Sequence, residues 1–186
     1  MKKILVVIFI SIGLLSCSKT ENEVLSSDIE TFIKANNEND FETLVDYYPE
    51  FFFDSISKSE VLVELKKFYS EDTKNKMVLD SDFKIDTIIY KNSRHYARIQ
   101  SGQTITMDLT EFEDENGMDY AVSMAYNLFV SQYGKDNVTY NKGEWIFHIR
   151  SEKPLYGMKN EHDNWKFIES NQDTGKHIPI EIITSQ

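Results

Sequence analysis

The residue with the most reactive side chain in this sequence is its only cysteine, Cys17. Lys2 and Lys3 open the chain, and residues 4–15 then form an apolar run that ends just before the cysteine. As a helix this run would rise about 18 Å, far short of the roughly 30 Å hydrocarbon core of a bilayer. A short apolar run that follows basic residues and ends at a small residue is typical of a secretory signal, which is removed from the mature protein.

The four residues that end with this cysteine resemble the lipobox of bacterial lipoproteins. They read Leu14-Leu15-Ser16-Cys17. In that family a diacylglyceryl group is attached to the cysteine sulfur, and cleavage before the cysteine leaves an N-terminus that carries acyl chains such as palmitate. The resemblance implies lipid attachment at Cys17, and Ser18 after it implies passage to the outer membrane of a Gram-negative bacterium. Two or three acyl chains, at about 0.8 kcal/mol per buried CH₂, make such an anchor effectively permanent.

Other residue types with catalytic or metal-binding potential do not form a recognisable motif. An acylated Cys17 has no thiol left for a disulfide, a metal or nucleophilic catalysis. Metal catalysis needs three or four converging ligands, whereas the four histidines are scattered, at His95, His148, His162 and His177. Serine nucleophile elbows, phosphate-binding loops and dinucleotide-binding glycine patterns are absent from the sequence. We therefore expect no metal, no cofactor and no catalytic set of these kinds.

One pair of predicted strands gathers polar side chains. Residues 94–100 and 104–112 alternate between polar and apolar, and Ser101-Gly102-Gln103 between them indicates a turn. Pairing across that turn would bring four side chains to one face of the sheet: Arg94, Tyr96, Arg98 and Asp108. On a concave face they would form a site for an anion or a polar ligand. The alternative, which we favour, is a solvated face stabilised by cross-strand pairs worth about 0.2–1 kcal/mol each.

Helices are predicted in the N-terminal part of the chain, before the strands that carry these polar side chains. Ser27 and Glu30 match a capping box, Asp40 matches an N-cap, and Ser57 and Glu60 match a second capping box. Apolar residues keep helical spacing after each of these starts. The sequence thus predicts three N-terminal helices.

Strands are expected from Met77 onward, with one further helix among them. That helix runs from an Asn116 cap to about Tyr133 and ends at Gly134. The predicted strands are 83–90, 94–100, 104–112, 137–140, 144–150, 154–159, 164–170 and an edge strand at 177–183. Helices followed by mostly antiparallel strands predict an α+β fold, with the helices packed on one face of the sheet.

Three stretches carry a resemblance to a known fold family. They are IETFIKANNENDFETLVDYYPEFFF, SKSEVLVELKKF and the closing NWKFIE. Together with the order of the elements, they are similar to the NTF2-like cone-shaped fold. That resemblance implies a curved, mostly antiparallel sheet around three N-terminal helices, often with a pocket between them. The helix inserted at 117–133 departs from the family's plan and is expected to plug the cone or to lie across its mouth.

The chain divides into three predicted segments. Residues 1–16 are the lipoprotein signal peptide, residues 17–26 a lipidated tether and residues 27–186 a single globular NTF2-like domain. Removal of residues 1–16 takes Lys2 and Lys3 away, so the formal net charge of −11 becomes −13. A field of this sign repels nucleic acid and anionic bilayer surfaces. We expect no nucleic-acid partner, and contact with the membrane only through the N-terminal lipid.

Two functions are compatible with these features. We favour a lipid-anchored protein of the cell envelope that is not an enzyme and serves as a binding or assembly module for a protein or a small molecule. The alternative is a small acid/base enzyme that uses a pocket in the cone, where burial raises the pKa of an aspartate. Two groups are candidates for that role: Asp46 with Tyr47 and Tyr48, and Asp108 with Tyr96. An ionisable side chain deep in an apolar cavity would favour the enzyme.

Overall fold

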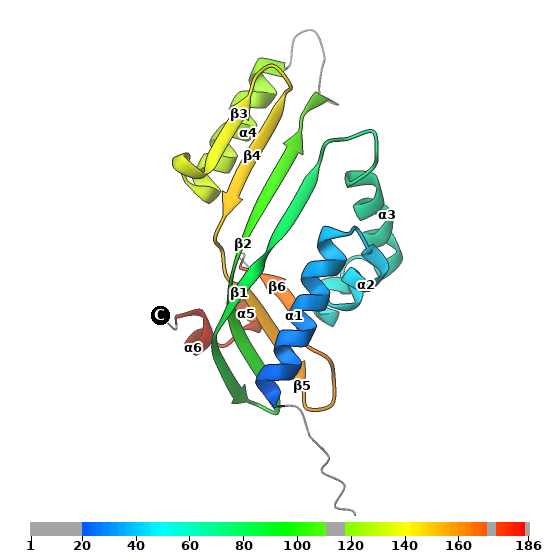
Figure 1. Ribbon diagram of the computed structural model, residues 1–186, viewed down its shortest axis with the longest axis vertical. Helices are drawn as coiled ribbons and strands as arrows, with labels where there is room; N and C mark the ends of the chain where they lie inside the picture. Colours follow the sequence, from blue (N-terminus) through cyan, green and yellow to red (C-terminus); the bar gives the residue numbers. More distant parts are fainter. Residues whose placement is uncertain (1–19, 111–117, 171–173, 185–186) are drawn as a thin grey trace, which may run out of the picture.

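The protein has an α+β fold in which helices cover a curved, open sheet of six antiparallel strands (Figure 1). This computed structural model describes residues 20–110, 118–170 and 174–184. The helical elements are α1 (Glu21–Asn37), α2 (Phe41–Asp46), η1 (Glu50–Phe53), α3 (Lys58–Phe68), α4 (Met118–Tyr133), η3 (Lys135–Asn137), α5 (Thr174–His177) and α6 (Ile180–Ile183). The strands are β1 (Lys76–Lys91), β2 (Arg94–Asp108), β3 (Val138–Asn141), β4 (Ile146–Ser151), β5 (Leu155–Asn160) and β6 (Lys166–Glu169).

The long strand β2 holds the sheet together. β1 pairs with it along most of its length, through a turn at Asn92 and Ser93, both of which have positive φ. On its other side β2 changes partner, because residues 94–99 pair with β5 and residues 103–108 pair with β4. The sheet therefore forks. We call α1, α2, η1, α3, β5, β6, α5 and α6 the large lobe, and α4, η3, β3 and β4 the small lobe, which occupies one end of the molecule (Figure 1).

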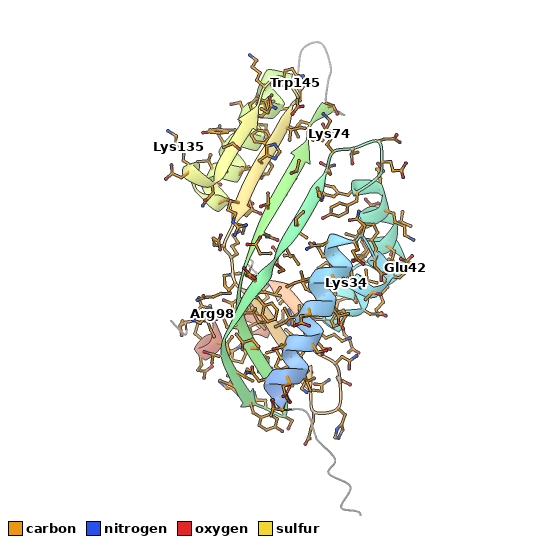
Figure 2. All side chains as sticks on the ribbon, viewed as in Figure 1. Lys34, Glu42, Lys74, Arg98, Lys135 and Trp145 are labelled. Atoms are coloured by element: carbon orange, nitrogen blue, oxygen red, sulfur yellow. The ribbon has the colours of Figure 1, made fainter. Side chains whose placement is uncertain are left out.

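The large lobe has a core on each face of the sheet. On one face, Leu25 and Ile29 of α1 pack with Trp165, and all three are fully buried. On the other face, Tyr96 of β2 packs with Ile182 of α6. Side chains alternate between the faces along a strand, so neighbouring residues of β2 serve different cores. Figure 2 shows Arg98 on the part of β2 near α6.

The small lobe has a single core, between α4 and the strands β3 and β4. Phe129 of α4 packs on Phe147 of β4, with ring centres 5.2 Å apart. Ile105 and Met107 of β2 join this cluster, and strand periodicity places them on the face of β2 that α1 covers further down. The inserted helix therefore covers its own pair of strands and does not fill the space beneath α1.

Two of the predicted helix starts are confirmed. The side chain of Asp40 accepts a hydrogen bond from the backbone nitrogen of Thr43 at 3.2 Å, as an N-cap does. Ser57 and Glu60 form the predicted capping box at the start of α3. Short-range capping patterns are readable here because the residues that make them are close together in the chain.

The first helix begins earlier than its predicted cap at Ser27. Thr20 and Glu23 form a capping box of their own, and α1 starts at Glu21. Both places match the pattern, but the earlier start adds Leu25 to the helix, where it is fully buried. Burial of this apolar side chain favours the longer helix.

The predicted turn at residues 101–103 is wrong, because these residues lie inside β2. Glycine is common in turns, but Gly102 lies in a strand, and glycine is required there because no room is left for a side chain. A Cβ atom at this position would overlap the side chains of Arg150 and Asp80. Those two side chains form a bidentate ion pair, with Nη2 to Oδ2 at 2.5 Å and Nη1 to Oδ1 at 3.0 Å. The predicted pairing of 94–100 with 104–112 therefore does not form.

The predicted edge strand at 177–183 is also wrong. This segment forms part of α5 and all of α6, with Pro179 at the N-cap of α6 and a φ of −57°. Proline fixes φ in the range that starts a helix. Ile178 and Ile182 are four residues apart and both buried in the core beside Tyr96, which is helical spacing.

Candidate functional site

A small apolar pocket lies between the N-terminal helices and the sheet of the large lobe. Its volume is about 170 Å³. Side chains of α1, the segment around η1, β1 and β6 line it: Phe32, Asn36, Tyr48, Phe52, Met77, Leu79, Phe167, Ile168 and Glu169. Glu169 is the only residue of this lining that carries a carboxyl group. An apolar pocket with few polar groups is the usual form of a small-molecule site.

Glu169 ends β6 on the face of the sheet that the helices cover. Phe167, which is 1% exposed, precedes it by one strand repeat. Gln103 donates a hydrogen bond from Nε2 to Oε2 of Glu169 at 3.1 Å. Burial raises the pKa of Glu169, although the hydrogen bond from Gln103 and the positive charge of Lys153 act against the increase. The carboxyl group therefore holds its proton to a higher pH than an exposed glutamate does.

The charge of Glu169 acts on three tyrosines. Tyr48 lies before η1, Tyr69 follows α3 and Tyr133 ends α4. Burial raises the pKa of each phenol, to about 12 for Tyr69, and the charge of Glu169 adds to the increase in all three. Tyr133 comes from the small lobe, so the charge of Glu169 acts on side chains of both lobes. Nζ of Lys153 lies 4.4 Å from the centre of the Tyr133 ring.

The side chain of Gln103 contributes an acceptor without a partner. Gln103 is 4% exposed, and its Oε1 has no hydrogen-bond partner among the residues that the structure describes. The bond to Glu169 directs Nε2 toward the carboxylate, which leaves Oε1 as the unpaired atom. A buried polar atom without a partner costs about 1–3 kcal/mol. A molecule that donates a hydrogen bond would remove that cost.

This arrangement suits one class of ligand. The carboxylate of Glu169 accepts hydrogen bonds, and the aromatic side chains of Phe32, Tyr48 and Phe167 line the same pocket. A molecule with an apolar body and a donating or positively charged head group matches these features. The raised pKa of Glu169 is also the property that a general acid or base needs near neutral pH.

Two larger hollows lie elsewhere on the large lobe, on either side of stacked rings. Their volumes are about 340 and 370 Å³, and Phe51 and His177 stand between them with ring centres 3.6 Å apart. Both are more open than the pocket at Glu169, and polar side chains line more of their surface. The smaller pocket is the better candidate because apolar walls enclose a carboxyl group there.

Asp46, the first suspected catalytic residue, lies outside the pocket. Its Oδ1 accepts a hydrogen bond from Nζ of Lys58 at 3.0 Å on the exposed surface. Its neighbour Tyr48 does line the pocket. The segment named from the sequence thus reaches the pocket through Tyr48, whereas the carboxyl group of Asp46 does not.

Asp108, the second suspect, has a structural role. Burial alone would raise its pKa, but hydrogen bonds from Thr110 and Lys74 outweigh burial and leave the pKa below its usual range. Its oxygens accept from the Thr110 backbone at 2.9 Å and from the Lys74 backbone at 3.1 Å. Tyr96 lies on the part of β2 that pairs with β5, far along the strand from Asp108. The predicted cluster of Tyr96, Asp108, Arg94 and Arg98 is therefore not assembled.

Sequence reasoning missed Glu169 and Gln103. A signal for Glu169 was present, because Trp165, Phe167 and Glu169 alternate along one strand and so share a face. A carboxyl group in register with two buried aromatics predicts a buried acid. The burial of Gln103 could not be predicted in this way, because a turn was expected at residues 101–103.

The remaining expected features are placed as follows. Cys17 lies outside the described residues. His95 is half-buried and contacts Tyr90, with ring centres 4.9 Å apart, while His148 is exposed. Among the described residues no three His, Cys, Asp or Glu side chains are arranged to hold a metal ion. In the same part of the chain, no helix combines the length and the apolar character needed to span a bilayer.

No protein-family model matches the chain, and no curated protein matches it. We therefore infer the function from the residues that line the pocket. The pocket offers a carboxyl group of raised pKa, at Glu169, and the ring of Tyr48 in an otherwise mainly apolar lining.

Proposed function

We propose that this protein is a lipid-anchored binding module of the cell envelope whose ligand site is the pocket at Glu169. The observation that carries the proposal is a carboxyl group inside an apolar pocket, beside a buried carbonyl that lacks a described partner. The ligand is a small molecule with an apolar body and an amine or other donating head group. The acidic character of the chain favours approach of such a cation.

The size of the pocket limits the ligand. A volume of about 170 Å³ is close to the roughly 150 Å³ cavity that accepts a benzene molecule. A single ring or a short branched chain therefore fits, and a larger molecule would have to extend past Phe52, which is 41% exposed. The head group would lie at Glu169, and the apolar body between Phe32 and Leu79.

The proposal is tested with benzylamine and benzoate, which share a ring and differ in the charge of the head group. Binding is followed by changes in the amide NMR spectrum of the protein. We expect benzylamine to bind and benzoate not to bind, because the carboxylate of Glu169 attracts the first and repels the second. The substitution Glu169→Gln should weaken benzylamine binding by about tenfold or more, since it removes a charge-assisted hydrogen bond.

The matched control is Glu64→Gln, which neutralises an exposed glutamate on α3. It changes the net charge by the same amount and should leave benzylamine binding unchanged. Equal binding of benzoate and benzylamine, or equal weakening by Glu64→Gln and Glu169→Gln, would contradict a specific site at Glu169.

The raised pKa of Glu169 also supports a second candidate, an acid/base enzyme. Glu169, in place of Asp46 or Asp108, would then remove or supply a proton. The test is exchange of α-deuterium from cyclopentanone, a ketone that fits the pocket. Exchange that the wild type accelerates and Glu169→Gln does not would favour the enzyme, and binding of benzylamine without any accelerated exchange would favour the binding module.

The fold itself supports a relation to the NTF2-like family. We propose that the domain is a variant of that cone, because three N-terminal helices face a curved antiparallel sheet and a pocket lies between them. The variant differs in the small lobe, where α4 covers β3 and β4. This addition also brings Tyr133 within the range of the Glu169 charge.

The anchor and the location are proposed from the sequence. Acylation of Cys17 would hold the protein on the outer membrane of a Gram-negative bacterium, with no other membrane contact and no nucleic-acid partner. The substitution Cys17→Ser should release the chain from the membrane fraction and abolish labelling by a fatty-acid probe. A Cys17→Ser chain that is still labelled would refute lipid attachment at this residue.

A further inference from the structure

Helix α4 exposes a row of large apolar side chains. Tyr120, Met124 and Leu128 are 71%, 56% and 54% exposed. They are spaced four residues apart, so they lie above one another along one side of the helix. We call these three residues the α4 ridge. Most large apolar side chains of α1, in contrast, are buried.

The ridge is not the side of α4 that packs on the sheet. That side carries Phe129, Val122, Ala125 and Tyr126, which contact the core of the small lobe. α4 is therefore apolar on both sides, a pattern typical of a helix that is covered all round. The sheet covers one side, and no described residue covers the ridge.

The part of α4 that carries the ridge has no charged residue. Residues 120–133 contain no Asp, Glu, Lys or Arg, in a chain of which 27% is charged. The exposed neighbours of the ridge are uncharged and polar: Ser123, Asn127, Ser131 and Gln132. An apolar centre without charge and with a polar rim is the composition of a protein–protein interface, and interfaces between identical subunits are more apolar than most.

We propose that the α4 ridge is the contact between two copies of this chain. The formal net charge of −11 makes two copies repel each other, and that repulsion is weakest where the surface carries no charge. Ridges formed by residues four apart pack into the grooves of a second, identical helix. A two-fold axis near the middle of the ridge would bring each Met124 next to its counterpart.

The position of α4 permits this contact on a membrane. The small lobe lies at one end of the molecule, and the described chain begins at the other end, where α1 starts (Figure 1). Two copies held by their N-termini in one membrane would therefore keep both ridges free to meet. The dimer does not require the anchor, so failure of either proposal leaves the other intact.

Cross-linking of the full chain in native membranes tests the contact. In the variant Met124→Cys, a short bis-maleimide reagent should join two chains and double the apparent mass on a reducing gel. The control Val63→Cys places the thiol on α3, at a residue that is 63% exposed, and should give no dimer. Cross-linking of the wild type, whose only cysteine is Cys17, reports separately on whether that thiol is free.

Sedimentation velocity of the purified chain in mild detergent measures the same contact without a new thiol. The wild type should show a dimer that dissociates on dilution. Met124→Glu should raise the dissociation constant by at least about tenfold, because it buries a charge at the centre of the interface. Val63→Glu is the matched control, since it adds the same charge to another exposed apolar position, and it should change nothing.

Three results would overturn the proposal. The first is a wild type that sediments as a monomer at every concentration. The second is cross-linking of the Val63→Cys chain to the same extent as the Met124→Cys chain. The third is equal weakening by Met124→Glu and Val63→Glu. Circular dichroism of each variant checks that the chain is folded, and Tyr120→Ser, a milder change in the ridge, should weaken the dimer if Met124→Glu unfolds.

Discussion

In the large lobe, helices cover both faces of the sheet, and Leu25, Ile29 and Trp165 are completely removed from solvent. In the small lobe, one helix covers one face of the strands, and its outer side exposes Met124 and Leu128. Strands of both lobes pair with the same strand, β2. The difference indicates that the large lobe supplies most of the stability, whereas the small lobe keeps apolar surface available for contact with another molecule.

The charge at the candidate site acts on both lobes. Glu169 and Tyr48 belong to the large lobe, and Tyr133, whose pKa the charge of Glu169 raises further, belongs to the small lobe. Gln103, next to the ion pair of Asp80 and Arg150, lies on the segment of β2 where pairing passes from β5 to β4. A ligand at Glu169 would therefore be sensitive to how the lobes are joined.

The largest expected effect comes from the core of the large lobe. Trp165→Ala removes a fully buried ring from between α1 and the sheet. We expect the free energy of unfolding to fall by about 3–5 kcal/mol, because the change loses buried apolar area and leaves a cavity. Urea denaturation followed by circular dichroism measures this.

Phe129→Ala provides the comparison in the small lobe. Phe129 is 8% exposed and packs mainly on Phe147, so its loss should reduce the free energy of unfolding less than Trp165→Ala does. If Phe129→Ala destabilises the protein as much as Trp165→Ala, the two lobes contribute equally and the comparison fails.

The second effect concerns the join between the lobes. Gly102→Ala places a methyl group where the Asp80–Arg150 ion pair lies. We expect a loss of about 1–3 kcal/mol in the free energy of unfolding, because the side chains have to move in a crowded part of the sheet. Benzylamine binding should weaken as well, since Gln103 is the next residue.

Gly175→Ala is the control for this change. A Cβ atom at Gly175 meets nothing within 4 Å, so alanine should be neutral or slightly stabilising there. Equal losses at Gly102 and Gly175 would mean that the effect comes from the loss of glycine flexibility and not from the ion pair.

The same glycine explains a limit of prediction from the sequence. Ser101-Gly102-Gln103 has the composition of a turn, and a local pattern cannot reveal a glycine that is required by residues 80 and 150. The helix caps at Asp40 and Ser57 were predictable because each depends on residues within one turn. The conformation of residues 101–103, in contrast, depends on contacts with residues that are distant in the sequence.

The candidate site shows the same limit. Phe32, Tyr48 and Phe167 belong to segments whose order predicted helices over a sheet, and a pocket between them is what the resemblance to the NTF2-like fold implies. The choice of Glu169 over Asp46 or Asp108 depends on burial, and burial depends on how β6 sits beneath α1. Alternation along residues 165–169 contains part of that information.

The third effect is a change in the pH dependence of stability. In the folded chain the pKa of Glu169 is raised above its value in the unfolded chain. The stability that this group contributes is complete below the unfolded pKa, near 4.3, and is lost as the pH rises through the folded pKa. Glu169→Gln has no proton to lose, so it should equal the wild type in acid and become more stable than the wild type as the pH rises through the folded pKa of Glu169.

Urea denaturation at a series of pH values checks this difference. The Glu64→Gln control should follow the wild type throughout, because Glu64 is exposed. A constant difference between Glu169→Gln and the wild type at every pH would show that Glu169 does not titrate in the range that its burial implies.

The smallest effect belongs to the outer side of the small lobe. Leu128→Ser changes a residue that is 54% exposed, whereas its neighbour Phe129 is buried against Phe147. At a dilution where the chain is monomeric, Leu128→Ser should alter the free energy of unfolding by no more than about 0.5 kcal/mol. At high concentration the wild type should gain stability from dimerisation and Leu128→Ser should gain less, since association stabilises the folded state by mass action. A loss that is large and independent of concentration would place Leu128 in the core of the lobe, and the difference between an inner and an outer side of α4 would disappear.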